Sequence, residues 1–221
     1  MERNPENNVK LGLFGGTFDP VHYGHISTVK EIHNRFNLTK TIFIPAHIPH
    51  HKKKPVTKSD HRLEMVKLSV LGFDYFEVLD AEIIHDGNSY SFQTIEYFKK
   101  SYKNKIDPFF ILGIDVFLEI STWKNYPNFF SESNFIVMNR PGYTSIKPED
   151  ILPTDIATEF DYNHENKSFK HKSGYCIHYV NVTPHDISST DIRAKIKEGR
   201  KTTGLISNKV SEYIKNNCLY S

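Results

Sequence analysis

Two histidines three residues apart follow a pair of glycines near the start of the chain. Gly15 and Gly16 open the stretch GGTFDPVHYGH, which contains His22 and ends with His25. Residues three apart at the start of a helix project from one face, so both imidazoles can face the same ligand. Glycines let the backbone approach a ligand closely, and the free amides of a helix N-terminus suit phosphate. The residue types and spacing therefore indicate a site for a phosphate-bearing ligand.

A second polar cluster lies near the other end of the chain, in the stretch ISSTDIR. Ser188, Ser189 and Thr190 suit a helix N-cap, where hydroxyls and unpaired amides are available to phosphate. Arg193 follows one turn later and can make bidentate contacts with a polyphosphate. Taken alone, this cluster would be an ordinary serine-capped helix, and the glycine and histidine motif makes the phosphate-binding interpretation preferable.

Alternating strands and helices must position these motifs. The expected strands are 9–14, 41–44, 76–79, 109–114, 134–138 and 175–182, and the expected helices are 23–36, 63–71, 91–102, 188–197 and 207–215. A strand, helix, strand order at the start implies a parallel crossover. We expect an α/β fold with a Rossmann-like, doubly wound parallel sheet and a helical C-terminal end. The whole chain, 1–221, is predicted to be a single domain, with an atypical polar surface segment at about 146–174.

Composition excludes several classes of protein. The 221 residues are 38% hydrophobic and 24% charged, with a formal net charge of +2. These values are typical of a globular protein, and the near-neutral charge argues against a surface that binds polyanions generally. No apolar stretch reaches the ~18 residues of a membrane helix, and the N-terminus lacks the apolar core of a signal peptide. Two cysteines, Cys176 and Cys218, cannot form a disulfide framework. We expect a cytoplasmic protein that binds neither membrane nor nucleic acid.

The two motifs resemble the signatures of the HxGH nucleotidyltransferase superfamily, GGTFDPxHxGH and ISSTxIR. Over nearly its whole length the chain resembles bacterial nicotinate-nucleotide adenylyltransferases. Further similar segments are PAHIPHHK at 45–52, NSYSFQT at 88–94, FILGID at 110–115, Trp123, RPGY at 140–143, and YI with LY at 213–214 and 219–220. The resemblance implies transfer of the adenylyl group of ATP to nicotinate mononucleotide, which gives deamido-NAD and pyrophosphate.

The resemblance also implies roles for individual residues. Those expected in catalysis are His22, His25, Lys52 and Arg193. Those expected to bind ATP are Gly15, Gly16, Thr17, Phe18, His25, Gly113, Asp115, Ser188, Ser189, Thr190 and Arg193. Those expected to bind nicotinate mononucleotide are Thr17, His51, Tyr90, Ser91, Thr94, Trp123 and Arg140. Mg²⁺ is expected on the ATP phosphates, bound through water, and no metal ligands are expected from the protein.

Several alternatives stay open at this point. The acceptor could be nicotinamide mononucleotide, or the chain could be another HxGH enzyme such as a phosphopantetheine adenylyltransferase. RNA binding is the alternative from a different class, although no basic segment supports it. Trp123 could be a core anchor and not a stacking platform. The oligomeric state, a homo-oligomer included, is undetermined by the sequence.

Overall fold

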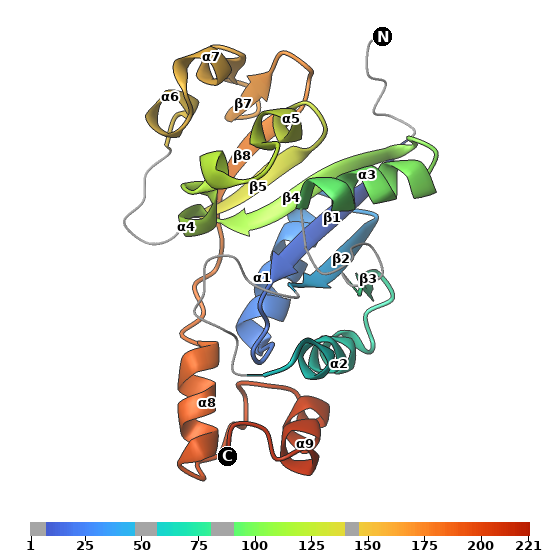
Figure 1. Cartoon of the computed structure of the whole chain (residues 1–221), viewed down its shortest axis with the longest axis vertical. Coiled ribbons are helices and arrows are strands. Elements are labelled where there is room, and N and C mark those ends of the chain that lie inside the picture. The colour runs from blue at the N-terminus through green and yellow to red at the C-terminus, as the bar shows by residue number, and fades with distance from the viewer. Residues whose placement is uncertain (1–7, 47–56, 81–90, 140–145) are drawn as a thin grey trace. The chain divides into compact units, whose positions relative to one another are not determined.

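The computed structural model describes residues 8–46, 57–80, 91–139 and 146–221 (Figure 1). The chain divides into two compact units. Unit 1 comprises Met1–Leu13 and Tyr90–Val182, and unit 2 comprises Phe14–Ser89 and Thr183–Ser221. Strand β1, Val9–Gly16, therefore begins in unit 1 and ends in unit 2.

Unit 1 is built on a sheet in which β1 is followed in order by β4, β5, β8, β7 and β6. These strands are β4 Ile106–Gly113, β5 Asn134–Asn139, β6 Phe160–Asn163, β7 Ser168–His171 and β8 Cys176–Asn181. Strands β4, β5 and β8 run parallel, whereas β7 is antiparallel to β8 and β6 is antiparallel to β7. The helices of this unit are α3 Ser91–Ser101, α4 Ile114–Phe117, the 3-10 helix Ile120–Thr122, α5 Tyr126–Phe130, α6 Pro148–Ile151 and α7 Thr154–Ala157.

Phenylalanine side chains form much of the core of unit 1. Every residue of β4 before Gly113 is buried, as expected for a parallel strand covered on both faces. The Phe110 ring meets that of Phe129 edge-on at 5.9 Å, and the Phe130 ring lies 5.2 Å from that of Phe135. The long apolar run that predicted this strand thus reflects its central position.

The polar segment at 146–174 contributes to this sheet, which the sequence analysis did not anticipate. Its strands β6 and β7 form an antiparallel hairpin, and β7 pairs with β8 through Phe169 and Ile177. Each strand has only four residues, and Phe169 is the one apolar residue of the two strands that is buried. Such short strands give too little alternation to be distinguished from loop sequence.

Unit 2 contains the end of β1 beside β2, Lys40–Pro45, and β3, Phe76–Val78, in the order β3, β2, β1. Strands β2 and β3 are parallel. Its helices are α1 Tyr23–Arg35, α2 Ser59–Val70, α8 Ser189–Lys197 and α9 Asn208–Asn216. Helices α2 and α9 pack against each other, as Figure 1 shows. The Phe43 ring is central to the core, edge-on to Phe14 at 5.5 Å and to Phe76 at 5.2 Å.

The predicted α/β class with a mostly parallel, doubly wound sheet is confirmed. Helix α1 begins at Tyr23, as predicted, and its stripe of Ile26, Val29 and Ile32 is buried. The single-domain assignment stays a prediction. In the described part of the chain, no helix has the length and apolar character needed to cross a bilayer.

Candidate phosphate-binding site

The turn between β1 and α1 is held tightly by packing. The Phe18 ring is buried and lies 5.5 Å from the ring of Phe14 and 5.2 Å from that of His25. A Cβ atom on Gly16 would stand 2.7 Å from Phe18 Cζ, so no larger residue fits there without moving the turn. The close neighbour of Gly16 is therefore the Phe18 ring, whereas Gly15 has open space, and close approach of a ligand to the glycine pair stays a prediction.

His22 and His25 cap helix α1 reciprocally. His22 is the N-cap residue, and its Nδ1 accepts a hydrogen bond from the His25 amide at 3.4 Å. His25 Nδ1 accepts one from the His22 amide at 3.2 Å. Because both Nδ1 atoms are acceptors, each neutral ring carries its proton on Nε2. The two rings stack with centroids 3.6 Å apart, so both present Nε2–H groups from one side of the helix start.

Burial keeps His22 neutral. Its side chain is 7% exposed, and desolvation, followed by the repulsion of His185, lowers the pKa of His22 from 6.5 to about 4. Neutral imidazole can donate one hydrogen bond without adding a full charge. His185 was not identified from the sequence, because a lone histidine in the TPHD stretch gives no sign that it lies beside His22.

Side chains from the start of helix α8 are hydrogen-bonded to the turn between β1 and α1. Ser188 is the N-cap, and its Oγ accepts from the Asp191 amide at 3.1 Å. Ser189 Oγ donates to the Pro20 carbonyl at 2.8 Å. Arg193 Nη1 donates to the Asp19 carbonyl at 2.7 Å, and its Nη2 donates to Thr190 Oγ1 at 3.3 Å. The structure thus brings the two predicted motifs together within unit 2.

Each of the three hydroxyls in the ISSTDIR motif has a hydrogen-bond partner within the protein. Ser188 caps its own helix, Ser189 fixes Pro20, and Thr190 orients Arg193. A guanidinium has five N–H donors, and the two contacts of Arg193 use two of them. The arrangement places a cation and a helix N-terminus on the same turn as the histidine pair, a combination suited to a polyphosphate.

Arg62 is fully buried and is hydrogen-bonded to the turn between β1 and α1. Its Nη1 donates to the Thr17 carbonyl at 2.7 Å, and its Nε donates to the Thr57 carbonyl at 3.2 Å. Burial lowers the pKa of Arg62, and the nearby charge of Asp19 opposes that effect. A buried arginine whose donors meet backbone carbonyls positions the chain, and the sequence analysis did not assign this role.

The remaining described candidates belong to unit 1. Gly113 is the N-cap of α4, Asp115 is exposed in the first turn of that helix, and Thr94 is buried in α3. Trp123 is half-buried, and its ring meets Phe110 at 5.8 Å and Phe129 at 5.7 Å, both edge-on. No hydrogen-bond acceptor among the described residues reaches its buried Nε1 atom.

Other candidates fall outside the described residues: His51, Lys52, Tyr90 and Arg140. Ser91 is the first residue of α3, and its side chain is outside the description. Within the described ranges, no group of three or more His, Cys, Asp or Glu residues could hold a metal ion.

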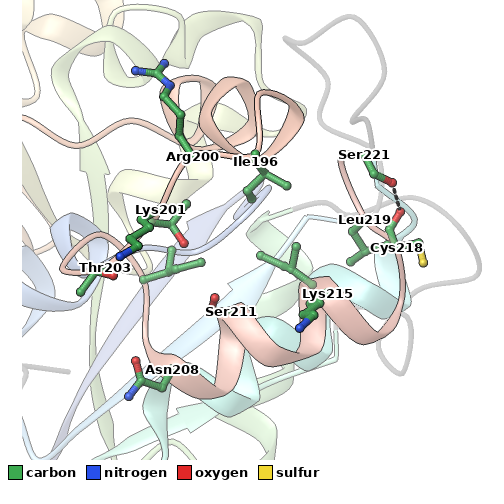
Figure 2. A pocket seen from close by; sticks show the side chains of 14 residues that line it. Ile196, Arg200, Lys201, Thr203, Asn208, Ser211, Lys215, Cys218, Leu219 and Ser221 are labelled. Atoms are coloured by element: carbon green, nitrogen blue, oxygen red, sulfur yellow. Dashed lines mark hydrogen bonds between the residues drawn. The ribbon is translucent and has the colours of Figure 1, made fainter.

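A separate pocket of about 690 Å³ lies in unit 2 between the C-terminal part of α8 and helix α9. Figure 2 shows Ile196 and Arg200 on one side and Ser211 and Lys215 on the other. None of the predicted site residues lines it.

Comparison with known proteins identifies the family. The cytidylyltransferase-like family model matches residues 13–195. A protein of Geotalea uraniireducens named "Probable nicotinate-nucleotide adenylyltransferase" is 36% identical over 214 residues, which cover 96% of this chain and 99% of the relative. A protein of the same name from Thermoanaerobacter sp. is 38% identical over 216 residues, covering 97% of this chain and 96% of the relative.

A solved structure has the same fold. The nicotinic acid mononucleotide adenylyltransferase of Plasmodium falciparum, complexed with NaAD, has a TM-score of 0.68 at 18% identity and covers 96% of this chain and 97% of its own. Both signatures, the near-complete coverage of bacterial relatives and the shared fold agree with the resemblance noted in the sequence. The chain belongs to the nicotinate-nucleotide adenylyltransferase family.

Proposed function

We propose that this protein transfers the adenylyl group of ATP to nicotinate mononucleotide, a step of NAD biosynthesis. One observation carries the proposal: the histidine pair and Arg193 with the start of α8 are hydrogen-bonded onto one turn, in a chain of this family. The phosphate oxygen of nicotinate mononucleotide attacks the α-phosphorus of ATP. The bond from that phosphorus to the oxygen bridging to the β-phosphorus breaks, and pyrophosphate leaves.

The acceptor needs no general base. A phosphomonoester has a second pKa near 6, so it is already ionised at neutral pH. Catalysis then depends on in-line positioning and on stabilising the charge that develops on the α-phosphate and on pyrophosphate. No serine or cysteine nucleophile is required, so the displacement proceeds without a covalent intermediate.

The Nε2–H groups of His22 and His25 are suited to the α-phosphate. Two rings stacked at 3.6 Å cannot both be cationic without strong repulsion, and His22 in particular stays neutral. They therefore act as fixed hydrogen-bond donors, the type of group that stabilises developing charge without reorganisation. Arg193 and the amides at the start of α8 hold the β and γ phosphates, where a full positive charge is useful.

Mg²⁺ fits this scheme as part of the ATP complex. The donor set of the turn consists of N–H groups, which bind phosphate oxygens and not a metal ion. Bound to the phosphates through water, the ion would supply further positive charge to the leaving pyrophosphate. Lys52 is proposed to face incoming phosphate charge.

Residues of unit 1 and residues outside the description are proposed for the nucleosides. Asp115 accepts from the ribose hydroxyls of ATP, for which its exposed place at the N-terminus of α4 is suitable. Trp123 is proposed to stack on the pyridine ring. Tyr90, Ser91 and Thr94, which lie close to one another in the sequence, are proposed to bind the same nucleotide. The remaining proposed contacts to nicotinate mononucleotide are Thr17, His51 and Arg140.

Pyrophosphate release with ATP and either nicotinate or nicotinamide mononucleotide tests this function. We expect faster release with the nicotinate form. Preference for nicotinamide mononucleotide, or for phosphopantetheine, would assign the protein to another specificity. Stabilisation by RNA and not by the nucleotides in a thermal shift assay would contradict an enzymatic role.

The variant His25→Ala tests the site itself. We expect turnover to fall by about 100-fold or more, since one preorganised donor to the developing charge is lost. His61→Ala is the matched control, because His61 lies on α2 and its Nδ1 is hydrogen-bonded to the Tyr213 hydroxyl at 2.9 Å. Near-normal turnover by His25→Ala would remove His25 from the mechanism.

A further inference from the structure

The hydroxyl of Tyr220 contacts the turn between β1 and α1, residues 17–22, which is called the phosphate-binding turn after its proposed role. It donates a hydrogen bond to Asp19 Oδ1 at 2.6 Å, and the two residues are 201 positions apart in the chain. Asp19 is only 5% exposed. Burial, then the hydrogen bond to Asp19, raises the pKa of the Tyr220 hydroxyl, so it remains a donor throughout the neutral range. A short hydrogen bond to a carboxylate is among the stronger contacts a protein makes.

Asp19 connects this hydroxyl to Arg193. The Asp19 side chain accepts from Tyr220, and its carbonyl accepts from Arg193 Nη1 at 2.7 Å. The neighbouring carbonyls of Thr17 and Pro20 are held by Arg62 and by Ser189. The hydrogen bond from Tyr220 therefore adds a side-chain anchor to the residue whose carbonyl positions the guanidinium.

The backbone around Tyr220 adopts a costly conformation. The φ angles of Cys218 and Tyr220 are 49° and 67°, in the left-handed region, which is unfavourable for a residue with a Cβ atom. Such angles persist where surrounding contacts impose them. The Leu219 amide bonds to the Ile214 carbonyl at 3.0 Å, and Ser221 Oγ bonds to the Cys218 carbonyl at 3.0 Å.

The segment 218–221 lines the pocket of unit 2, with the exception of Tyr220. Cys218, Leu219 and Ser221 are pocket residues, and Figure 2 shows them at the end of α9 with the hydrogen bond that closes this turn. Tyr220 is not a lining residue, and its hydroxyl is bonded to Asp19. The left-handed turn thus separates one side chain from its neighbours and directs its hydroxyl to the phosphate-binding turn.

We propose that Tyr220 is a positioning residue for ATP, which acts through Asp19 to fix Arg193 at the phosphates. This inference rests on the proposed function, since it requires that Arg193 binds the polyphosphate. It predicts that loss of one oxygen atom at the far end of the chain weakens the binding of ATP specifically.

Tyr220→Phe tests the inference because it removes the hydroxyl and keeps the ring. We expect about tenfold weaker binding of ATP by calorimetry, the equivalent of one hydrogen bond to a charged group. The affinity for nicotinate mononucleotide should stay within twofold. A merely structural role would lower the melting temperature and weaken both ligands alike, which would overturn the proposal.

Tyr213→Phe is the matched control. Tyr213 also lies near the end of the chain in unit 2, and its hydroxyl bonds to His61 Nδ1 at 2.9 Å, away from Asp19. The control should bind ATP as the unchanged protein does. If both variants lose ATP affinity equally, the effect does not depend on Asp19 and the proposal is wrong.

A double-mutant cycle tests the route through Arg193. In an Arg193→Lys background, the further change Tyr220→Phe should weaken ATP binding by less than twofold, because the group that it positions is already altered. Full additivity would overturn the proposal. Should Tyr220→Phe fail to fold, Asp19→Asn weakens the same hydrogen bond, and the same selective loss of ATP affinity is expected.

ATP binding and pyrophosphate release by the unchanged protein show whether the inference alone fails or the proposed function fails as well. If it releases no pyrophosphate and binds no ATP, the proposed function falls and the inference with it. If it and Tyr220→Phe bind ATP and turn over equally well, only the inference falls.

Discussion

Replacement of His22 by asparagine should make the stability of the protein less sensitive to acid. The folded-state pKa of His22 is lowered from 6.5 to about 4 by burial. Between pH 6.5 and about pH 4, His22 is protonated in the unfolded chain and neutral in the folded chain. The contribution of His22 to the free energy of unfolding is therefore fully present above pH 6.5, and it is lost as the pH falls toward 4. Asparagine is a preferred N-cap residue, so helix α1 keeps its cap while the titrating group is removed.

The size of the effect follows from the two pKa values. A lowering from 6.5 to about 4, at roughly 1.4 kcal/mol for each unit, corresponds to about 3 kcal/mol over the whole range. About 2 kcal/mol of this loss falls between pH 7 and pH 5. His33, whose pKa is also lowered by burial, and Glu159, whose pKa is lowered by Lys172 and His171, are present in both proteins. The difference between the proteins therefore reports His22 together with its repulsion of His185.

Urea unfolding at pH 7 and pH 5 measures the effect. Circular dichroism should be the probe because the single tryptophan, Trp123, lies in unit 1 and His22 lies in unit 2. The variant should lose about 2 kcal/mol less than the unchanged protein on acidification. His164→Asn, which removes an exposed histidine from the turn between β6 and β7, should lose as much as the unchanged protein. Equal losses for His22→Asn and the unchanged protein would refute the reasoning.

Two further changes test the packing of the turn. Arg62→Met should cost about 3 kcal/mol in the free energy of unfolding, since two buried carbonyls lose their donor; a loss below 1 kcal/mol in urea would contradict this. Gly16→Ala should cost about 1 to 3 kcal/mol, because the added methyl overlaps the buried Phe18 ring, whereas Gly15→Ala, with open space, should leave the melting temperature unchanged.

Local signals predicted the elements that position the site. The apolar run before Gly15, the spacing of Ile26 and Val29, and the serine at position 188 correctly gave β1, α1 and the cap of α8. These features depend on neighbours within about one helical turn, so a sequence pattern can carry them.

Contacts between distant residues were not predictable in the same way. The bond from Ser189 to the Pro20 carbonyl and that from Arg193 to the Asp19 carbonyl involve backbone acceptors, which leave no trace in residue type. The sequence placed the hydroxyls of the second motif toward phosphate, and the structure also gives them partners within the protein. Their roles toward ATP stay predictions.

The phosphate-binding turn is completed by residues from opposite ends of the chain, and this has a consequence for synthesis on the ribosome. Domains form as the chain emerges from its N-terminus. Asp19 emerges long before its partners, because Arg193 follows it by 174 positions and Tyr220 by 201 positions. A nascent chain that lacks these residues therefore holds an incomplete turn, and the proposed ATP site forms only after they have been made.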